Sequence, residues 1–260
     1  MQEIDIFSLV EQYEKEIFRD GDITEKSYYK SEKCDLLLDN VTKKMKKCTF
    51  IMALKSRSKR AINSIISIVT ELTYKDFDFI IVEDIYESDD ILEIPSEYSS
   101  FITHLKVDTK LKWNKSVLMN IGIKNSLTEC FVMWDADFIF TENFRKKFTE
   151  VIKKVLVREL VISIPSFETH ESYNIGVLYK EKESYGGLWV IPKRAAIEAE
   201  WFNENINGWG FEETDLIKRI VPMFIKNKLM LSYYYDIIVF HHSHSDEMRV
   251  FIEDNSKFIK

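Results

Sequence analysis

The chain is poor in residues that break regular structure and in residues that cross-link a fold. Its 260 residues include only seven glycines, four prolines and three cysteines. So few glycines and prolines argue against a disordered, collagen-like or loop-dominated chain. The cysteines, Cys34, Cys48 and Cys130, fit neither a disulfide framework nor a metal-ligand spacing. We therefore expect a reducing compartment.

Long hydrophobic runs and massed basic charge are also missing. No apolar run approaches the roughly 20 residues that span a bilayer, and the acidic, amphipathic start is unlike a secretory signal. The net charge is −7, and basic residues cluster only locally, at 43–47 and 55–60. That pattern argues against a nucleic-acid partner. Because 45% of the residues are hydrophobic, a cytoplasmic protein with a sizeable core is expected.

The first 47 residues differ in pattern from the rest. Apolar residues recur there at roughly helical spacing and charged residues then dominate, so we expect an N-terminal helical extension at 1–47 and a main domain at 48–260. The amphipathic pattern raises the hypothesis of peripheral membrane contact. The recurring apolar residues are Ile4, Phe7, Val10, Tyr13 and Ile17.

From residue 48 onward, short apolar segments alternate with amphipathic ones. This alternation is typical of an α/β fold in which helices flank a mixed, mostly parallel sheet. The expected strands are 50–54, 77–84, 130–137 and 161–166, and the expected helices are 58–72, 114–127 and 141–157. The expected N-caps are Ser58, Asn114 and Thr141. The expected buried stripes are Val117, Leu118 and Ile121 in one helix and Phe144, Phe148, Val151, Ile152 and Val155 in the next.

Carboxylates end two of the expected strands. Glu83 and Asp84 end one, and Asp135 and Asp137 end another, at the sheet edge where ligands bind in such folds. Strand alternation would send Asp135 and Asp137 to one side, with Ala136 opposite, and two converging carboxylates suit Mg²⁺ or Mn²⁺. A D-x-D triplet is also common by chance, and the acids at 83–84 fit a polar loop equally well.

Three further segments concentrate unusual residues. Cations at the start of the first expected helix, 52–60, suit a phosphate, although a solvated basic turn explains them as well. Residues 186–220 hold four of the seven glycines and three of the five tryptophans, and 239–247 hold three of the five histidines. A binding site is the simplest reason for such concentration.

In order and spacing, these segments resemble a GT-A glycosyltransferase of the family 2 type, near the β-1,4-galactosyltransferase and chondroitin-polymerase branches. The resemblance covers roughly three quarters of the chain, from Cys48 to about Met248. It is carried by FIMALKSR, IIVED, WNKSVLMNIGI, WDADFIF and GG…WFNENINGWGFEETDL.

The resemblance implies a donor site and a divalent metal. Asp137, helped by Asp135, would bind Mn²⁺ or Mg²⁺; His241 and His244 match the completing histidines best, and His242 stays open. Lys115 would lie near the donor phosphates. The residues implied around the nucleotide sugar are Ala53, Lys55, Arg57, Glu83, Asp84, Lys115, Asp135, Ala136, Gly187 and Trp209.

The resemblance also implies the acceptor chemistry. Glu213 would be the catalytic base, Glu212 would hold acceptor hydroxyls and Trp209 would offer a stacking face. Two acids at a helix N-terminus also suit the helix dipole without any catalysis. The sequence departs from the family pattern at Ala53, Ser56, Lys115, Phe211 and Glu213.

These observations lead to one expected function and two alternatives. The expected enzyme is an inverting, metal-dependent hexosyl- or N-acetylhexosaminyltransferase that uses a UDP-hexose or UDP-N-acetylhexosamine donor. Its acceptor would be a glycan, glycolipid or glycoprotein. A nucleotidyltransferase would share the first half of the fold, but no Gly-rich pyrophosphate loop opens the chain. A non-catalytic nucleotide-sugar or glycan-binding module would have no need of Glu213.

Overall fold

The structure of this chain is a computed structural model in which eight segments are described. They are residues 48–69, 77–140, 142–158, 160–164, 166–169, 188–227, 230–233 and 239–242. All of them belong to one compact unit, Asn40–Lys260. The expected N-terminal extension, 1–47, and the expected site residues Gly187 and His244 lie outside the described residues.

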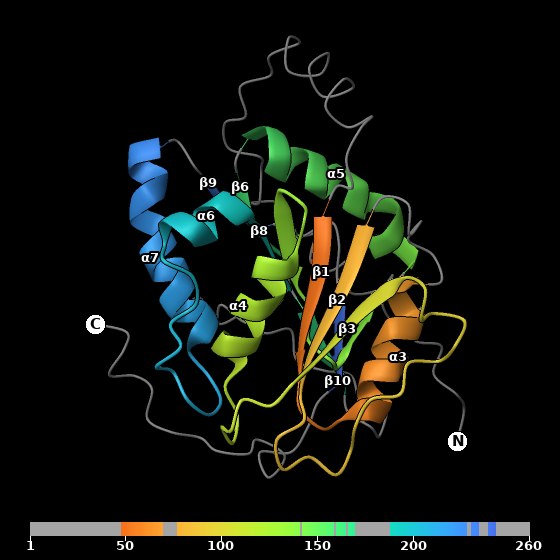
Figure 1. The fold of residues 1–260 in the computed structure, drawn as a ribbon. Helices are drawn as coiled ribbons and strands as arrows, with labels where there is room; N and C mark the ends of the chain where they lie inside the picture. The colour runs from red at the N-terminus through yellow and green to blue at the C-terminus, as the bar shows by residue number, and fades with distance from the viewer. Residues whose placement is uncertain are drawn as a thin grey trace. The chain divides into compact units, whose positions relative to one another are not determined.

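The main sheet has seven strands in the order β3-β2-β1-β4-β8-β6-β9 (Figure 1). The first four in this order are mutually parallel, β8 is antiparallel to both neighbours, and β6 and β9 are parallel to each other. The mixed, mostly parallel sheet expected from the sequence is therefore confirmed. The strands are β1 (Cys48–Leu54), β2 (Phe77–Asp84), β3 (Ile102–Val107), β4 (Cys130–Met133), β6 (Leu160–Ile164), β8 (Leu188–Pro192) and β9 (Met230–Tyr233).

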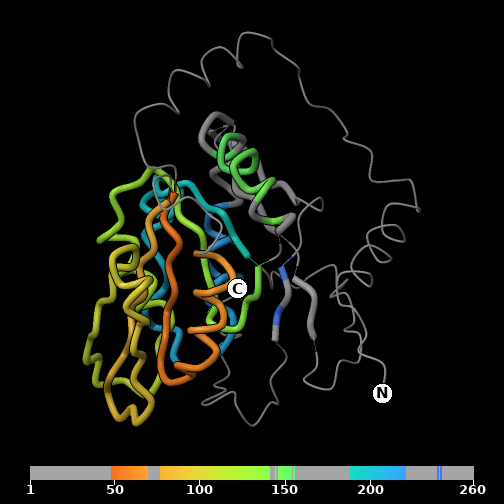
Figure 2. Tube along the Cα trace, turned by 90° about the vertical axis from the view of Figure 1, so that its right-hand side faces the viewer, coloured from red at the N-terminus to blue at the C-terminus, as the bar shows by residue number. Residues whose placement is uncertain are grey.

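Helices cover both faces of this sheet (Figures 1 and 2). Side chains of α3 and α5 pack on one face, and those of α4, α6 and α7 on the other. Alternation along β1 divides its residues between the two cores: Phe50 and Met52 face α3 and α5, and Ile51 and Ala53 face α4. The helices are α3 (Ser58–Val69), α4 (Lys115–Asn125), α5 (Glu142–Arg158), α6 (Lys193–Glu198) and α7 (Glu212–Asn227).

The core beneath α3 and α5 is largely aromatic. The Phe50 ring has five aromatic neighbours, with ring centroids 5.2–6.2 Å away. The whole predicted stripe of α5 is fully buried here, which confirms it. Burying one such side chain contributes about 1.5–3 kcal/mol, so this layer holds the sheet rigid beneath the strand ends.

The opposite core depends on a close approach of α4 to β1. A Cβ placed on Gly122 would lie 2.3 Å from Cγ2 of Ile51, so only glycine fits there without a shift. The buried stripe of α4 also differs from the predicted one. Leu118 is buried as expected, but Val117 and Ile121 are only half-buried. The remaining buried apolar side chains of α4 are Met119 and Ile123.

One of the predicted helix N-caps, Asn114, is present in the structure, and another, Ser58, is not. Asn114 caps α4 as predicted: its Oδ1 accepts a hydrogen bond from Val117 N at 3.0 Å. The Ser58 prediction is wrong, because Ser58 is the first residue of α3 and its backbone N donates to Asp90 Oδ2 at 2.9 Å. Hydrogen bonds from the side chain and backbone of Ser58 hold the pKa of Asp90 below its usual value. Thr141 lies outside the described residues.

The predicted strand 130–137 is too long. β4 ends at Met133, and residues 134–137 form a turn in which Phe138 N donates to Asp135 O at 3.1 Å. The turn is anchored from both sides, since Trp134 N donates to Ile51 O and its indole donates to Ser64 Oγ at 2.7 Å. The D-x-D acids therefore lie on a turn, and strand alternation does not orient them.

After this turn the chain enters a second, three-stranded sheet in the order β5-β10-β7. Its strands are β5 (Phe138–Phe140), β7 (Ser166–Thr169) and β10 (Val239–His242). The predicted strand 161–166 is therefore two strands, β6 and β7, in different sheets.

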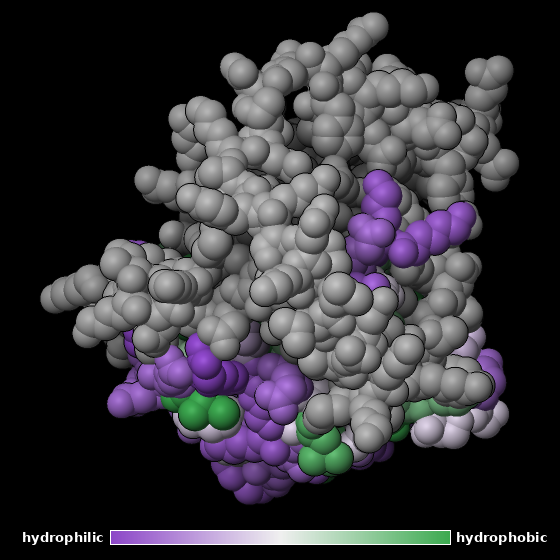
Figure 3. All heavy atoms as spheres, turned by 90° about the horizontal axis from the view of Figure 1, so that it is seen from above, coloured by the Kyte–Doolittle hydropathy of each residue, from purple (hydrophilic) through white to green (hydrophobic). Residues whose placement is uncertain are grey.

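The surface seen from above is mainly hydrophilic where its residues are described, and hydrophobic side chains show only as small separate patches (Figure 3). Within the described ranges, no helix combines the length and apolar character needed to cross a membrane.

Candidate active site

The candidate site lies at the lower end of the main sheet in Figure 1, where the loop after β1 and the starts of α4 and α7 meet. Asn114 links two of these parts. It caps α4, and its Nδ2 donates to Glu204 O at 2.8 Å and to Asn207 Oδ1 at 3.1 Å. Gly208 N also donates to Trp113 O at 3.0 Å. These bonds fix the loop before α7 against the start of α4.

Lys115 joins the D-x-D turn to α7. Its Nζ lies 2.7 Å from Asp135 Oδ1 and 2.6 Å from Glu213 Oε1. These three residues are called the Asp135 group below. Burial lowers the pKa of Lys115, but Asp135, Glu213 and Glu212 outweigh that effect and hold the pKa well above its usual value. Lys115 is therefore a permanent cation between two carboxylates.

Asp137 has different partners on the other side of the turn. It is 4% exposed, with Arg57 Nη1 3.5 Å from Oδ2 and His241 Nε2 3.3 Å from Oδ1. These three residues are called the Asp137 group. Strand pairing explains the histidine: β10 runs antiparallel to β5, and His241 pairs with Phe138, directly after Asp137.

The turn between β1 and α3 has a strained backbone at Ser56 and Arg57. Ser56 and Arg57 are consecutive residues with φ values of 57° and 66°. Non-glycine residues rarely adopt this left-handed conformation, which costs on the order of 1–3 kcal/mol each. Such strain clusters at functional sites, and here it accompanies a side chain that reaches Asp137.

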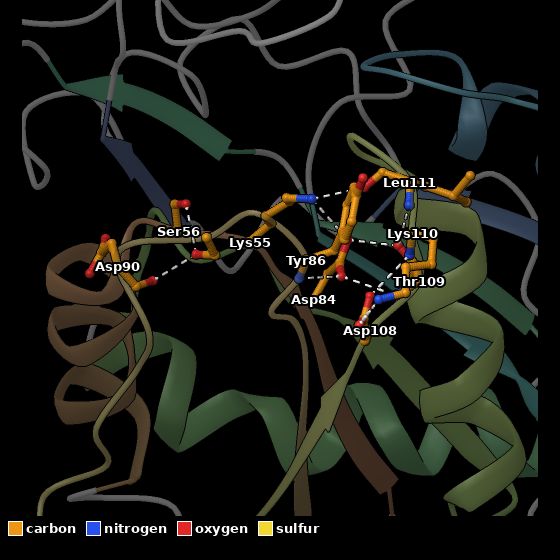
Figure 4. Close-up of polar contacts among 10 residues, drawn as sticks. Lys55, Ser56, Asp84, Tyr86, Asp90, Asp108, Thr109, Lys110 and Leu111 are labelled. Carbon is orange, nitrogen blue, oxygen red and sulfur yellow. Dashed lines mark hydrogen bonds and ion pairs between the residues drawn. The ribbon is translucent and has the colours of Figure 1, made fainter.

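Asp84 ties three loops to the end of β2 (Figure 4). Its Oδ2 lies 3.0 Å from Lys55 Nζ and 2.8 Å from Thr109 Oγ1, and its Oδ1 accepts from Tyr86 N at 3.0 Å and Thr109 N at 3.2 Å. Lys55 also donates to Leu111 O at 2.9 Å. Asp84 and Lys55 thus meet at the strand ends and hold the loops there.

Glu83 does not join either carboxylate group. It is fully buried, and its two oxygens contact Leu92 N at 2.7 Å and His104 Nε2 at 2.8 Å. No motif in the sequence singled out His104. Its position follows from strand pairing, because β3 lies beside β2.

Two features of this edge escaped sequence reasoning. The ring of Tyr86 has two ammonium groups near its face, Lys55 Nζ and Lys110 Nζ, each 5.4 Å from the ring centroid. Lys110 also forms a short contact with Asp108 (Figure 4). An aromatic residue two positions after the acids of a strand end was the available signal.

Glu212 has an unusual environment for a carboxyl group. It is 2% exposed, and its Oε2 has no hydrogen-bond partner in the described part of the chain. Burial, followed by the charge of Glu213, raises its pKa to about 8. At neutral pH it is therefore mainly protonated and can act as a hydrogen-bond donor.

The segment before α7 exposes two aromatic rings. Trp209 is 37% exposed and Phe211 is 43% exposed, while Gly208 and Gly210 take φ values of 76° and 101°. Glycine adopts such values without steric cost. The remaining expected site residues, Ala53 and Ala136, are buried in the cores on opposite faces of the sheet.

Three members of the predicted metal set, Asp135, Asp137 and His241, are described. No cluster of three or more His, Cys, Asp or Glu side chains within the described ranges forms a ready metal site. The donor chemistry nevertheless fits Mn²⁺ or Mg²⁺, because both accept carboxylates and Mn²⁺ also accepts imidazole. Both contacts of Asp137 quoted above exceed the 2.7–2.9 Å typical of a strong charge-assisted bond.

A mostly parallel sheet with acidic residues at its carboxyl edge is the arrangement of GT-A glycosyltransferases. Residues 55–225 match the family described as glycosyl transferase family 2. Because this match covers more than half of the chain, the chain belongs to glycosyl transferase family 2. The family acts on a nucleotide-sugar donor and an acceptor. A comparison with curated proteins finds no match.

Proposed function

We propose that the chain is an inverting, metal-dependent transferase that moves a hexosyl or N-acetylhexosaminyl group from a UDP-sugar to a hydroxyl of a glycan, glycolipid or glycoprotein. The GWG segment followed by two acids favours the β-1,4-galactosyltransferase and chondroitin-polymerase branches. One observation carries the proposal. Lys115 bridges the first D-x-D acid to Glu213, so the proposed metal-binding and proton-accepting groups lie beside one another.

The donor side consists of the Asp137 group with its neighbours. Asp137, Asp135 and His241 would hold Mn²⁺ or Mg²⁺, with His244 as a further proposed ligand. A bound divalent ion would neutralise charge on the leaving diphosphate. Arg57 and Lys55 add positive charge at the N-terminus of α3, where anions bind favourably.

The transfer step uses Glu213 as the base. Its carboxylate takes the proton of the acceptor hydroxyl as the acceptor oxygen bonds to the anomeric carbon. The bond from that carbon to the diphosphate oxygen breaks, and its electron pair leaves with the nucleoside diphosphate. Attack from the face opposite the leaving group inverts the anomeric centre. Lys115 holds the Glu213 oxygen at 2.6 Å and thereby orients the base.

The acceptor side is formed by the first turn of α7 and the segment before it. Protonated Glu212 has a buried oxygen without a partner among the described residues, and an acceptor hydroxyl would satisfy it. An unsatisfied buried polar atom costs about 1–3 kcal/mol, so this hydrogen bond favours acceptor binding. Trp209 supplies a partly exposed ring for a sugar to stack on.

Thermal stabilisation by a panel of nucleotides and nucleotide sugars, with and without Mn²⁺, tests this proposal. A ligand at 100 times its Kd stabilises the native state by about 2.7 kcal/mol. The expected result is a Mn²⁺-dependent rise in melting temperature with UDP and one UDP-sugar. A rise with another nucleotide would replace the UDP assignment, and no rise with any would contradict the donor assignment altogether.

A further inference from the structure

Phe211 has a backbone conformation that its side chain disfavours. Its φ is 76°, in the left-handed region where a Cβ crowds the following carbonyl oxygen and where glycine is the usual residue. It directly follows Gly210, whose φ is 101°. The chain thus places a bulky ring at a position where a smaller residue would relieve strain.

Packing does not explain the ring. Phe211 is 43% exposed and belongs to neither hydrophobic core. Its backbone O accepts a hydrogen bond from Asp215 N at 2.9 Å, which any residue could do. A side chain kept for stability would be buried, so the exposure of Phe211 favours a role in binding.

The surroundings of Phe211 fit a binding surface. Trp209, two residues earlier, is 37% exposed, and a Cβ placed on Gly210 would meet no atom within 4 Å outside its chain neighbours Trp209 and Phe211. Two partly exposed aromatic residues therefore lie on either side of Gly210 in the sequence, beside space that no more distant residue fills. The other exposed large hydrophobic side chains of the described residues are single and aliphatic: Ile66, Ile85, Leu127 and Ile197.

The ring pair also has a defined place relative to the chemistry. Phe211 immediately precedes Glu212 and Glu213, the first two residues of α7. A molecule whose hydroxyl reaches Glu213 and that extends past Gly210 meets these rings. The backbone strain and the exposed rings thus occur together, directly before the proposed base.

We propose that Phe211 determines acceptor specificity. Together with Trp209 it forms a two-ring surface that receives an apolar group continuing beyond the reacting sugar, either the C–H face of a second sugar ring or a hydrophobic aglycone. Sugar faces and apolar groups both bind aromatic rings through the same dispersion and desolvation forces. The proposal rests on the proposed transferase function.

Saturation-transfer NMR tests this surface without requiring turnover. The probes are the free sugar and the phenyl β-glycoside of glucose, galactose, N-acetylglucosamine and N-acetylgalactosamine. The wild type is expected to saturate the phenyl protons of at least one glycoside, and Phe211→Asn to reduce that signal at least fivefold. Asparagine tolerates left-handed φ, so the melting temperature of Phe211→Asn should be unchanged or higher.

Leu127→Asn is the matched control, because Leu127 is a single exposed apolar residue. It should leave the phenyl signal unchanged. Absence of phenyl saturation in the wild type, or equal saturation in Phe211→Asn, would overturn the proposal. Two further probes of the bound sugar then separate the two sources of the apolar group. A larger Phe211-dependent signal with the octyl β-glycoside would indicate a hydrophobic aglycone, and a larger one with a β-linked disaccharide would indicate a second sugar ring.

Failure of the transferase assignment gives a separate result. A wild type that shows no Mn²⁺-dependent shift with any nucleotide contradicts the proposed function, whatever the NMR signal. A wild type that binds UDP and Mn²⁺ but shows no Phe211-dependent phenyl signal contradicts only the acceptor proposal.

Discussion

The two acids of the D-x-D turn lie two residues apart but in different surroundings. In the Asp135 group, Lys115 holds two carboxylates at 2.7 and 2.6 Å. In the Asp137 group, the contacts quoted to arginine and histidine are 3.5 and 3.3 Å. Short charge-assisted contacts are the stronger ones, so Lys115 holds its two partners more firmly than either quoted contact holds Asp137. The difference supports the proposal that Lys115 positions Glu213 as the base, with Asp137 on the donor side of the turn.

Asp137→Asn should abolish metal-dependent donor binding and have the largest effect of these variants. It keeps the side-chain shape and removes the charge that a divalent ion requires. Metal stabilisation of a leaving group is worth several kcal/mol, so we expect transfer to fall about a thousandfold and the Mn²⁺-dependent shift with UDP to vanish. Thermal-shift titrations and turnover assays measure both. A variant that keeps the Mn²⁺-dependent shift would remove Asp137 from the metal site.

Glu213→Gln should remove the proposed catalytic base and leave donor binding intact. The amide cannot take the acceptor proton, so transfer should fall by about 10²–10⁴-fold, with the UDP and Mn²⁺ shift retained. Glu129→Gln, at an exposed position outside both groups, is the matched control. Full transfer by Glu213→Gln would show that another residue is the base.

Local pattern was enough to predict much of the fold. β2 begins and ends at the predicted residues, Asn114 caps α4, and the α5 stripe is buried throughout. Each of these depends on neighbours within a few residues in sequence. The strand–helix alternation then fixed the sheet class and placed the acids at its carboxyl edge.

What the sequence could not predict depends on contacts between distant residues. The cap of α3 comes from Asp90, 32 residues beyond Ser58, and the turn at 134–137 exists because Trp134 bonds to β1 and α3. Lys115 was expected near phosphates, and its bridge to Glu213 spans 98 residues. Hydrophobic periodicity reports only on neighbours in the sequence, so it cannot predict contacts between such distant residues.

Lys115→Met tests whether the fixed geometry of the Asp135 group matters. Methionine keeps the length of the side chain but leaves two carboxylates facing each other without a cation. A misplacement of about 1 Å can cost about 10²-fold, so we expect transfer to fall roughly 10–100-fold. Unfolding free energy should drop by less than the 3–5 kcal/mol typical of fully buried pairs, because Asp135 and Glu213 keep 35% and 21% of their side chains exposed.

Two companion variants distinguish positioning from general damage. Lys115→Arg retains the positive charge and should recover most of the transfer rate. Lys124→Met, on the last turn of the same helix, should change neither rate nor base geometry. If Lys115→Met were as active as wild type, the bridge would be incidental to catalysis.

Glu212→Gln should give the smallest effect, a pH-dependent change in stability. The unfolded chain ionises Glu212 near its ordinary pKa of 4.5, whereas the folded chain keeps the proton up to about pH 8. The stability that the wild type has with Glu212 protonated in both states is therefore fully present below about pH 4.5. It is lost progressively as the pH rises to about 8, because the unfolded chain releases this proton before the folded chain does. Glutamine does not ionise, so the melting temperature of the variant should rise relative to that of the wild type by several °C between pH 5 and pH 8. Thermal unfolding across this pH range measures the difference. A difference that stays constant across this range would mean that Glu212 ionises normally, and the acceptor side would then begin with a second carboxylate instead of a hydrogen-bond donor.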